Sequence, residues 1–444
     1  MKKIIYLVVV VCFGFTSCQQ DDRESELNEE LQKVLEDAGE GQGYSYFLLP
    51  DASDYNSIPQ DPNNQLTKEK VELGKLLFHE TAFGTIGKFP ITVKEYSCAS
   101  CHHAGAGFQS GLAQGLGEGG EGFGLMGEGR TRNQLCASEL CDVQPLRSPT
   151  VLNGAYQPLM LWTGQFGATS FNIGTEDQWT PETPKETNML GFEGLETQAI
   201  AGLTVHRMEY DKESVTNNGY KSMFDNVFGN VEVASRYSTV NAGLAIAAYE
   251  RTLTAYNAPF QKYLRGNQYA IPDFQKEGAI LFFGKANCST CHTGPALNKM
   301  EFHALGLDEF DQSIVTHYNP EDPAKFGRAM FTGKENDRYK FKTPQLYNLK
   351  DVNFLGHGAS IRSIKEMVDY KNNGTPENNS VPLSQISDEF KPLGLTDLEV
   401  EKVVAFIKYS LYDPNLDRFV PSSLPSGACF PNNDDQSRED LDCD

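Results

Sequence analysis

The sequence predicts a mostly α-helical protein of two similar halves with long irregular loops. Helical spacing of apolar residues recurs along the chain, whereas the alternation typical of strands is scarce. The stretches ELGKLLF (72–78) and KEGAILFF (276–283) are similar, and a Cys-x-x-Cys-His motif follows each of them. The connections between the helices are rich in Gly, Pro and Asn, which is typical of loops.

The beginning of the chain has the pattern of an export signal. Two lysines precede an apolar run that is too short to span a membrane, and we predict a signal peptide over residues 1–17. Cys18 follows at the position of the lipidated cysteine of bacterial lipoproteins. We therefore expect an exported protein, periplasmic or held at the outer membrane by a lipid anchor at Cys18, with ordinary secretion as the alternative. Residues 18–65 are then the anchor and a polar spacer with one short helix.

The chain is acidic, with a formal net charge of −22 at pH 7. It lacks the general electrostatic footprint of a nucleic-acid-binding protein, so we predict no nucleic-acid partner. The simplest interpretation of the charge is solubility. The alternative is an acidic face that steers a basic protein partner.

The first half begins with a predicted helix for which Thr67 is a suitable N-cap. Apolar residues follow it at helical spacing, at Val71, Leu73, Leu76 and Leu77. The second half repeats this order after Pro272, where a helix leads through a short link into the second Cys-x-x-Cys-His motif.

Each half also ends with an amphipathic helical pattern, over residues 239–256 and 395–412. The second of these patterns begins with a capping box of Thr396 and Glu399. We therefore divide the body into an N-terminal domain (66–257), a C-terminal domain (258–420) and a tail (421–444).

The chain has ten cysteines, and four of them belong to the two repeated motifs. One other lies in the predicted signal, and one is the candidate anchor. The remaining four form two closely spaced pairs, Cys136 with Cys141 and Cys429 with Cys443. An oxidising compartment favours disulfides in such pairs, so we predict both bonds.

The repeated motif is the attachment sequence of c-type haem. Its two cysteines can form thioether bonds to the haem vinyl groups, and the histidine presents its imidazole to the iron. A redox-active CxxC needs no following histidine, and a structural zinc site would join both cysteine pairs and leave the histidines without a role. We therefore predict two covalently bound haem c groups. Their residues are Cys98, Cys101 and His102 in the first copy and Cys288, Cys291 and His292 in the second.

The order of motifs resembles the bacterial di-haem cytochrome c peroxidase family, including its branch of tryptophylquinone-forming enzymes. The resemblance covers roughly residues 66–412, and it implies two cytochrome c-like haem domains with long irregular loops. The first haem would be the peroxidatic one, and the second would pass electrons to it. The stretches that carry the resemblance include SCASCH, RSPTVLNGAY, LWTG, LETQAIAGLTVHRMEY, NCSTCHTG, YKFKTPQLYNL and HGASIRSIKEMVDYKNNG.

The resemblance also implies residues that act on peroxide. Trp162 matches a tryptophan between the two haems, and Gln198 matches the glutamine on the distal side of the first haem. Glu209 matches the family's distal glutamate, which would move the proton during O–O cleavage. From its chemistry alone His206 could do the same, since imidazole titrates in the useful range, and the third alternative is that neither residue does. Arg207 would stabilise charge on the leaving oxygen.

Several positions depart from the family pattern. Most members carry a histidine that blocks the first iron, but between His102 and Arg147 this chain has only His103, which is adjacent to the proximal ligand and cannot reach the opposite face. The first haem is therefore expected to have an open position in the oxidised state. Arg147 replaces a calcium-binding asparagine, which makes the family's calcium doubtful and suits a haem propionate instead.

The sixth ligand of the second haem stays open between three residues. A methionine is usual there, and a tyrosine occurs in the quinone-forming branch. A gapless comparison places Lys371 at this position with Tyr370 beside it, and Met367 lies one helical turn before. His357 matches a family histidine near the second haem, with a structural role as likely as ligation.

These features predict a cytochrome-c peroxidase that reduces hydrogen peroxide to water with electrons from a small cytochrome c or cupredoxin. The alternatives are a di-haem oxidase that modifies a protein substrate and a lipoprotein that only transfers electrons. Homodimers are common in the family. The acidic charge suits a basic donor.

Overall fold

A computed structural model describes residues 11–89 and 92–443, with side chains from Arg23 onward. The predicted signal peptide over 1–17 lies partly outside these residues, and the side chain of Cys18 lies outside them too, so both stay predictions. Among the helices of the described ranges, none has the length and apolar character needed to cross a membrane.

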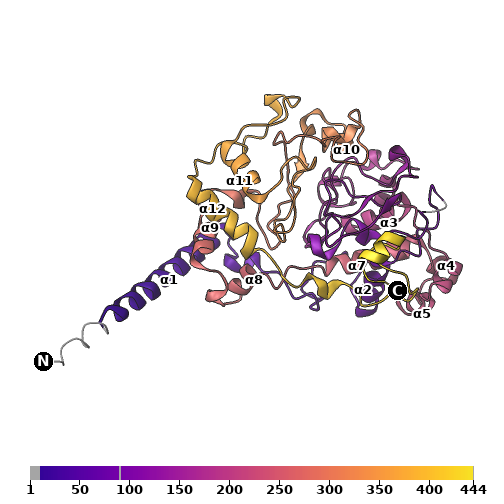
Figure 1. Cartoon of the computed structure of the whole chain (residues 1–444), viewed down its shortest axis with the longest axis horizontal. Coiled ribbons are helices and arrows are strands. Elements are labelled where there is room, and N and C mark those ends of the chain that lie inside the picture. The colour runs from indigo at the N-terminus through magenta and orange to yellow at the C-terminus, as the bar shows by residue number, and fades with distance from the viewer. Residues whose placement is uncertain (1–10, 90–91, 444) are drawn as a thin grey trace.

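The fold is mostly α-helical, as predicted, and its two halves lie side by side (Figure 1). In the described part of the chain, strands are limited to two antiparallel pairs, β1 (Gly120–Glu121) with β2 (Thr131–Arg132) and β3 (Phe302–His303) with β4 (Phe341–Lys342). The α-helices are α1 (Val11–Ala38), α2 (Lys68–His79), α3 (Gly194–Val205), α4 (Lys212–Asn217), α5 (Lys221–Val227), α6 (Val233–Arg236), α7 (Thr239–Arg251), α8 (Pro259–Leu264), α9 (Asp273–Phe283), α10 (Ala329–Thr332), α11 (Ile364–Asn373), α12 (Asp397–Ala405) and α13 (Asp435–Asp440).

In each half, the helix before the Cys-x-x-Cys-His motif packs against the helix that ends the half. These pairs are α2 with α7 and α9 with α12. Both crossings are close because a glycine lies at each: a Cβ on Gly74 would lie 1.8 Å from the carbonyl oxygen of Ala245, and one on Gly278 would lie 1.9 Å from that of Lys402. Gly74 and Gly278 occupy the same place in ELGKLLF and KEGAILFF, so the duplication seen in the sequence is also a duplicated packing contact.

The predicted helix starts are confirmed. The Thr67 side chain accepts a hydrogen bond of 3.2 Å from the backbone N–H of Lys70, at the start of α2. Thr396 and Glu399 form the capping box expected at the start of α12. Side-chain caps therefore fix where α2 and α12 begin.

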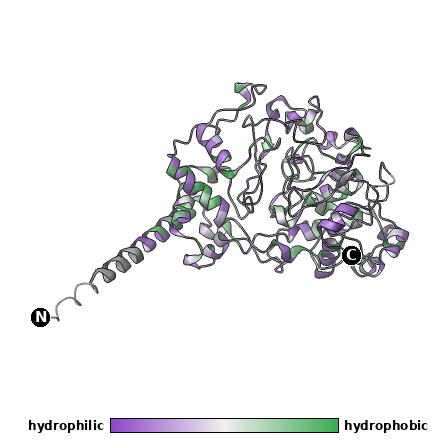
Figure 2. Ribbon diagram, in the orientation of Figure 1, coloured by the Kyte–Doolittle hydropathy of each residue, from purple (hydrophilic) through white to green (hydrophobic). Residues whose placement is uncertain are grey.

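The segment predicted as a spacer is instead part of the folded body. Helix α1 packs against α9 of the second half, where Leu31 and Leu35 are fully buried. Phe47 is also buried and meets Phe283 edge to face, with ring centroids 5.0 Å apart. The apolar residues of this polar stretch lie on one side of the helix, so they bury although the composition resembles a linker. Figure 2 shows hydrophobic colour where α1 joins the body and hydrophilic colour farther out.

The C-terminal tail crosses back to the first half and supports the first Cys-x-x-Cys-His turn. The Ser97 hydroxyl donates a hydrogen bond of 2.8 Å to the carbonyl oxygen of Pro431, and the Ser100 hydroxyl bonds to the side chain of Asn432. The two ends of the chain thus pack on opposite halves: the N-terminal helix on the second and the tail on the first.

One predicted disulfide is confirmed and the other is not formed. A disulfide bond joins Cys429 to Cys443 within the C-terminal tail. Cys136 and Cys141 are buried free thiols, so the prediction of a bond between them is wrong for this structure. Both thiols instead donate to the carbonyl oxygen of Ala137, at 3.6 Å from Cys136 and 3.5 Å from Cys141.

Candidate functional site

Both Cys-x-x-Cys-His motifs fold into the same short turn. Each leading cysteine and the two residues after it form a 3₁₀ turn, over Cys98–Ser100 and Cys288–Thr290. The backbone N–H of His102 then bonds to the carbonyl of Cys98 at 3.1 Å, and that of His292 bonds to the carbonyl of Cys288 at 2.9 Å. The turn places two thiols and one imidazole together, as the attachment of a haem requires.

Each motif histidine is oriented by a backbone carbonyl. Nδ1 of His102 lies 3.4 Å from the carbonyl oxygen of Phe108, and Nδ1 of His292 lies 3.1 Å from that of Leu297. This contact leaves Nε2 of each ring for a metal. Burial is the main cause that lowers the pKa of both histidines to about 4. Both imidazoles are therefore neutral near pH 7, which is the form that ligates iron.

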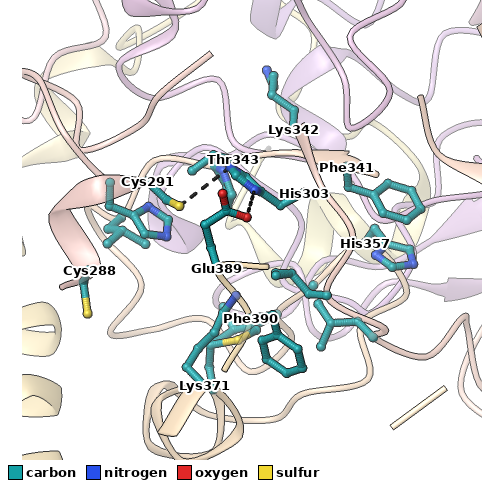
Figure 3. Close-up of a pocket in the computed structure, with 18 of the residues that line it drawn as sticks. Cys288, Cys291, His303, Phe341, Lys342, Thr343, His357, Lys371, Glu389 and Phe390 are labelled. Atoms are coloured by element: carbon teal, nitrogen blue, oxygen red, sulfur yellow. Dashed lines mark hydrogen bonds and ion pairs between the residues drawn. The ribbon is translucent and has the colours of Figure 1, made fainter. Parts of the chain in front are cut away.

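The second motif opens into a cavity of about 750 Å³ in the C-terminal half. Cys288, Cys291 and His292 line it, as do Lys371 and Met367 of α11. Figure 3 shows Cys288, Cys291 and Lys371 among the lining residues. Most of the remaining lining is apolar. Thiols on a turn, an oriented imidazole and a large apolar cavity fit a haem group.

The geometry narrows the choice of sixth ligand. Tyr370 donates its hydroxyl to the carbonyl oxygen of Leu305 at 2.6 Å, and its side chain is not among those that line the cavity. Lys371 does line the cavity, and burial lowers its pKa to about 8. Its charge also lowers the pKa of His292, which places the two side chains near each other. The structure thus favours Lys371 or Met367 over Tyr370.

Trp162 and Arg147 lie between the two halves. The Trp162 indole N–H donates a hydrogen bond of 2.8 Å to the carbonyl of Arg147, and its ring meets His357 of the second half at 6.4 Å between centroids. Both residues line the cavity at the second motif, and the Arg147 charge also lowers the pKa of His102 of the first motif. The predicted bridge residue therefore lies at the junction of the two sites, whereas His357 stacks on Phe341 at 3.6 Å.

Two buried cations face this mainly apolar cavity. Arg147 donates to the Gln109 side chain at 2.7 Å and to the Ser110 carbonyl at 2.8 Å, while its buried Nε has no hydrogen-bond partner among the described residues. Lys342 bonds to the Gln157 side chain, and burial lowers its pKa to about 7. Neither has a carboxylate partner among the described ion pairs, so both suit the propionates of a haem. Sequence reasoning missed Lys342, since a lysine before a Thr-Pro pair gives no signal of burial.

Helix α3 presents one face at the first site. Gln198, Gly202 and His206 follow each other at intervals of four residues on this face. A Cβ on Gly202 would meet only Gln198, at 3.3 Å, and His206, at 4.0 Å, so the space above the glycine is otherwise open. His206 also lies near enough to His102 to lower the pKa of that residue. The predicted distal residues Gln198 and His206 are therefore brought together beside the first motif.

The other two distal candidates point elsewhere. The Glu209 side chain is exposed and lies 3.4 Å from the Thr85 hydroxyl. The Arg207 guanidinium forms an ion pair with Glu118 at 2.5 Å, so it is held by a buried carboxylate rather than free for a substrate. The geometry thus favours His206 over Glu209 as the acid–base group.

His103 does not block the first site. Its buried ring meets Phe123 edge to face at 5.1 Å, and a Cβ on Gly127 would lie 2.3 Å from its Nε2. Neither ring nitrogen has a hydrogen-bond partner among the described residues. The ring therefore packs into the Gly-rich loop, as expected for a residue that cannot reach the opposite face.

The chain is similar in sequence to known di-haem proteins. A family model described as di-haem cytochrome c peroxidase matches residues 68–269. The chain is 28% identical over 359 residues to methylamine utilization protein MauG of Methylorubrum extorquens, across 81% of this chain and 82% of that protein. It is 29% identical over 387 residues to cytochrome-c peroxidase IdrP1 of Pseudomonas sp., across 81% and 85%. It is 26% identical over 353 residues to cytochrome c551 peroxidase of Nitrosomonas europaea, across 79% and 83%.

Solved structures share the fold. A MauG-like protein associated with microbial copper homeostasis matches with a TM-score of 0.55 at 20% identity, across 83% of this chain and 95% of that one. The diheme peroxidase BthA from Burkholderia thailandensis matches with a TM-score of 0.52 at 16% identity, across 82% and 90%. At these identities the likeness to the solved structures shows the fold alone. The chain is therefore similar to the di-haem cytochrome c peroxidase family, and its named relatives support a haem-dependent peroxidase.

Proposed function

We propose that this chain reduces hydrogen peroxide to water with electrons from a small cytochrome c or cupredoxin. The observation that carries the proposal is the face of α3, where His206 and Gln198 flank the open space above Gly202 near His102. A proton acceptor and an amide beside an open iron position are what peroxide cleavage needs. Electron transfer alone does not require a proton acceptor and an amide at this position.

The residues that would hold the two haem groups are those of the repeated motif. Cys98 and Cys101 would bind the first group covalently, with His102 on its iron, and the second motif would do the same for the other group. When bound, a haem with an open coordination position binds peroxide and supplies the electrons that break its O–O bond.

The chain's own residues would bind the substrate and move its proton. Nε2 of His206 is the proton acceptor, and the Gln198 side-chain amide is a hydrogen-bond donor beside it. Lys371 or Met367 would complete the coordination of the second haem, and Trp162 would carry electrons between the two sites. We also propose that the protein is exported and anchored through Cys18. A Cys18→Ser variant should then move from the membrane fraction to the soluble fraction.

Rapid mixing of the oxidised protein with peroxide tests the function. His206→Gln should slow the first reaction by about 100-fold, in line with loss of a general acid–base group, while Glu209→Gln should react like the wild type. Turnover should also consume a reduced cytochrome. A wild-type protein that does not respond to peroxide, or a Glu209→Gln variant slower than His206→Gln, would contradict this assignment.

A further inference from the structure

His206 has a buried carboxylate as its partner. Its Nδ1 lies 2.7 Å from Oδ2 of Asp142, whose side chain is only 4% exposed, whereas the His206 side chain is 38% exposed. Among the described residues, Nε2 of His206 has no hydrogen-bond partner in the protein. The imidazole ring is therefore held at Nδ1 by Asp142, while Nε2 has no protein partner among the described residues.

We propose that Asp142 is a positioning residue for peroxide cleavage, which fixes the tautomer and direction of His206. This inference rests on the proposed function and deepens it. A carboxylate that accepts from Nδ1–H keeps the lone pair of a neutral ring on Nε2, where it can take a proton. The same carboxylate stabilises the imidazolium that forms after proton transfer.

Asp142 is held rigidly enough for this role. Its backbone N–H donates to the carbonyl of Glu118 at 2.9 Å, and its own carbonyl accepts from the N–H of Gly117 at 2.9 Å. A Cβ on Gly117 would lie 2.7 Å from Oδ2 of Asp142, so the carboxylate packs directly on the glycine. Both backbone and side chain of Asp142 are thus fixed before any substrate arrives.

The backbone at His206 is fixed as well. Helix α3 ends there in a Schellman motif, with Met208 N–H bonded to Leu203 carbonyl at 2.8 Å and Arg207 N–H bonded to Thr204 carbonyl at 3.1 Å. Arg207 adopts the left-handed conformation, with φ of 58°. Strain of this kind at a non-glycine residue persists where the surroundings enforce it, and it is common at functional sites.

The neighbouring Arg207 hydrogen-bonds Glu118 rather than Asp142. Arg207 donates from Nε to Glu118 at 2.6 Å, whereas its Nη2 lies 3.8 Å from Asp142. The Arg207 charge still acts on the pair, since it lowers the pKa of both Asp142 and His206. Tyr96 donates its hydroxyl to the carbonyl of His206 at 2.7 Å and adds no charge.

The remaining charged groups act from a greater distance. Lys88 lowers the pKa of Asp142, and His206 lowers the pKa of His102. Burial alone would lower the pKa of His206, but the Asp142 carboxylate outweighs burial and raises it. Asp142 and His206 thus act together as one proton-accepting unit. The sequence does not indicate this pair, because the two residues are 64 positions apart.

The test compares the haem-loaded wild type with Asp142→Asn, His206→Gln and the double variant. Glu139→Gln is the matched control, since it removes one exposed carboxylate from the same loop. Asp142→Asn should slow the reaction with peroxide by about 10- to 100-fold and add nothing in the His206→Gln background. Glu139→Gln should match the wild type. A further loss from Asp142→Asn in the double variant would show a merely structural role and overturn the proposal.

Cyanide provides a readout that does not depend on peroxidase activity. It arrives at neutral pH as HCN and binds iron as the anion, so its association needs a proton acceptor at the same place. The wild-type rate should fall as pH drops through a midpoint above 6.5, the ordinary value for histidine, and the midpoint should move lower in Asp142→Asn. A wild-type midpoint below 6.5 would overturn the proposal without any variant. A cyanide response without a peroxide reaction would instead reject the proposed function and keep the pair.

Discussion

The Trp162 indole donates a 2.8 Å hydrogen bond to the carbonyl oxygen of Arg147, and this contact lies where the two halves of the molecule meet. The backbone joins the halves at the same place, because the N–H of Lys342 bonds to the Trp162 carbonyl at 2.8 Å and the N–H of Arg147 bonds to the His357 carbonyl at 2.8 Å. The tryptophan is therefore positioned by both halves. An aromatic ring fixed in this way is suited to carry electrons between them.

Replacement of Trp162 by Phe should slow electron transfer from the second site to the first. The ring stays apolar, but the indole and its bond to Arg147 are lost. We expect a decrease of about tenfold or more, which corresponds to about 1.4 kcal/mol in activation free energy. Reduction of the first haem after mixing with a reduced donor measures this rate. Trp179→Phe is the matched control, because Trp179 is the only other tryptophan and its indole bonds locally to Thr175 at 3.2 Å. Equal rates for the two variants would contradict the bridge role.

Lys371→Ala should change the absorption and electron paramagnetic resonance spectra of the second haem. The Lys371 amine lines the cavity near His292, so its loss would remove a candidate ligand of the second haem. Tyr370→Phe should leave both spectra unchanged and only weaken the docking of α11, by about 1 kcal/mol, through loss of the bond to Leu305. If Met367→Leu changes the spectra and Lys371→Ala does not, Met367 is the ligand.

Gly278→Ala should destabilise the second half. The added Cβ would lie 1.9 Å from the carbonyl oxygen of Lys402, and a backbone contact of this kind is relieved only if α9 and α12 move apart. Overpacking costs about 1–3 kcal/mol, which urea unfolding followed by circular dichroism would detect. Gly74→Ala should do the same between α2 and α7. Gly105→Ala is the control, since its Cβ would meet its nearest neighbour, Met126, at an ordinary 3.4 Å.

The helices and the haem motifs could be predicted from the sequence because their signals are local. Thr67 and Thr396 cap helices within four residues, and each Cys-x-x-Cys-His motif is one continuous turn. The Asp142–His206 pair could not be predicted, since no spacing rule connects a loop aspartate with the end of α3. The burial of α1 was missed for a related reason, because α1 packs against α9, a helix more than two hundred residues away in the sequence.

Glu95→Gln should stabilise the protein at alkaline pH. Burial and the negative charge of Asp434 in the tail raise the pKa of Glu95 to about 7, against an ordinary value of 4.5. The folded protein therefore binds a proton more tightly than the unfolded chain, so stability from this group is present below pH 4.5 and is lost as pH rises through about 7. Because Glu95 is only partly buried, solvent screening limits the gain of the variant at pH 8 to about 1 kcal/mol.

Urea unfolding of Glu95→Gln and the wild type at pH 4.5 and pH 8 checks this sign. The two proteins should have similar free energies of unfolding at the lower pH and separate at the higher one. Glu439→Gln removes an exposed carboxylate from α13 of the same tail and should show no such separation. An equal gain at both pH values would mean that Glu95 acts through packing rather than through its proton. In that case the buried ion pair of Arg130 with Asp434, at 3.1 Å, would hold the tail, and charge repulsion between Glu95 and Asp434 would not affect stability.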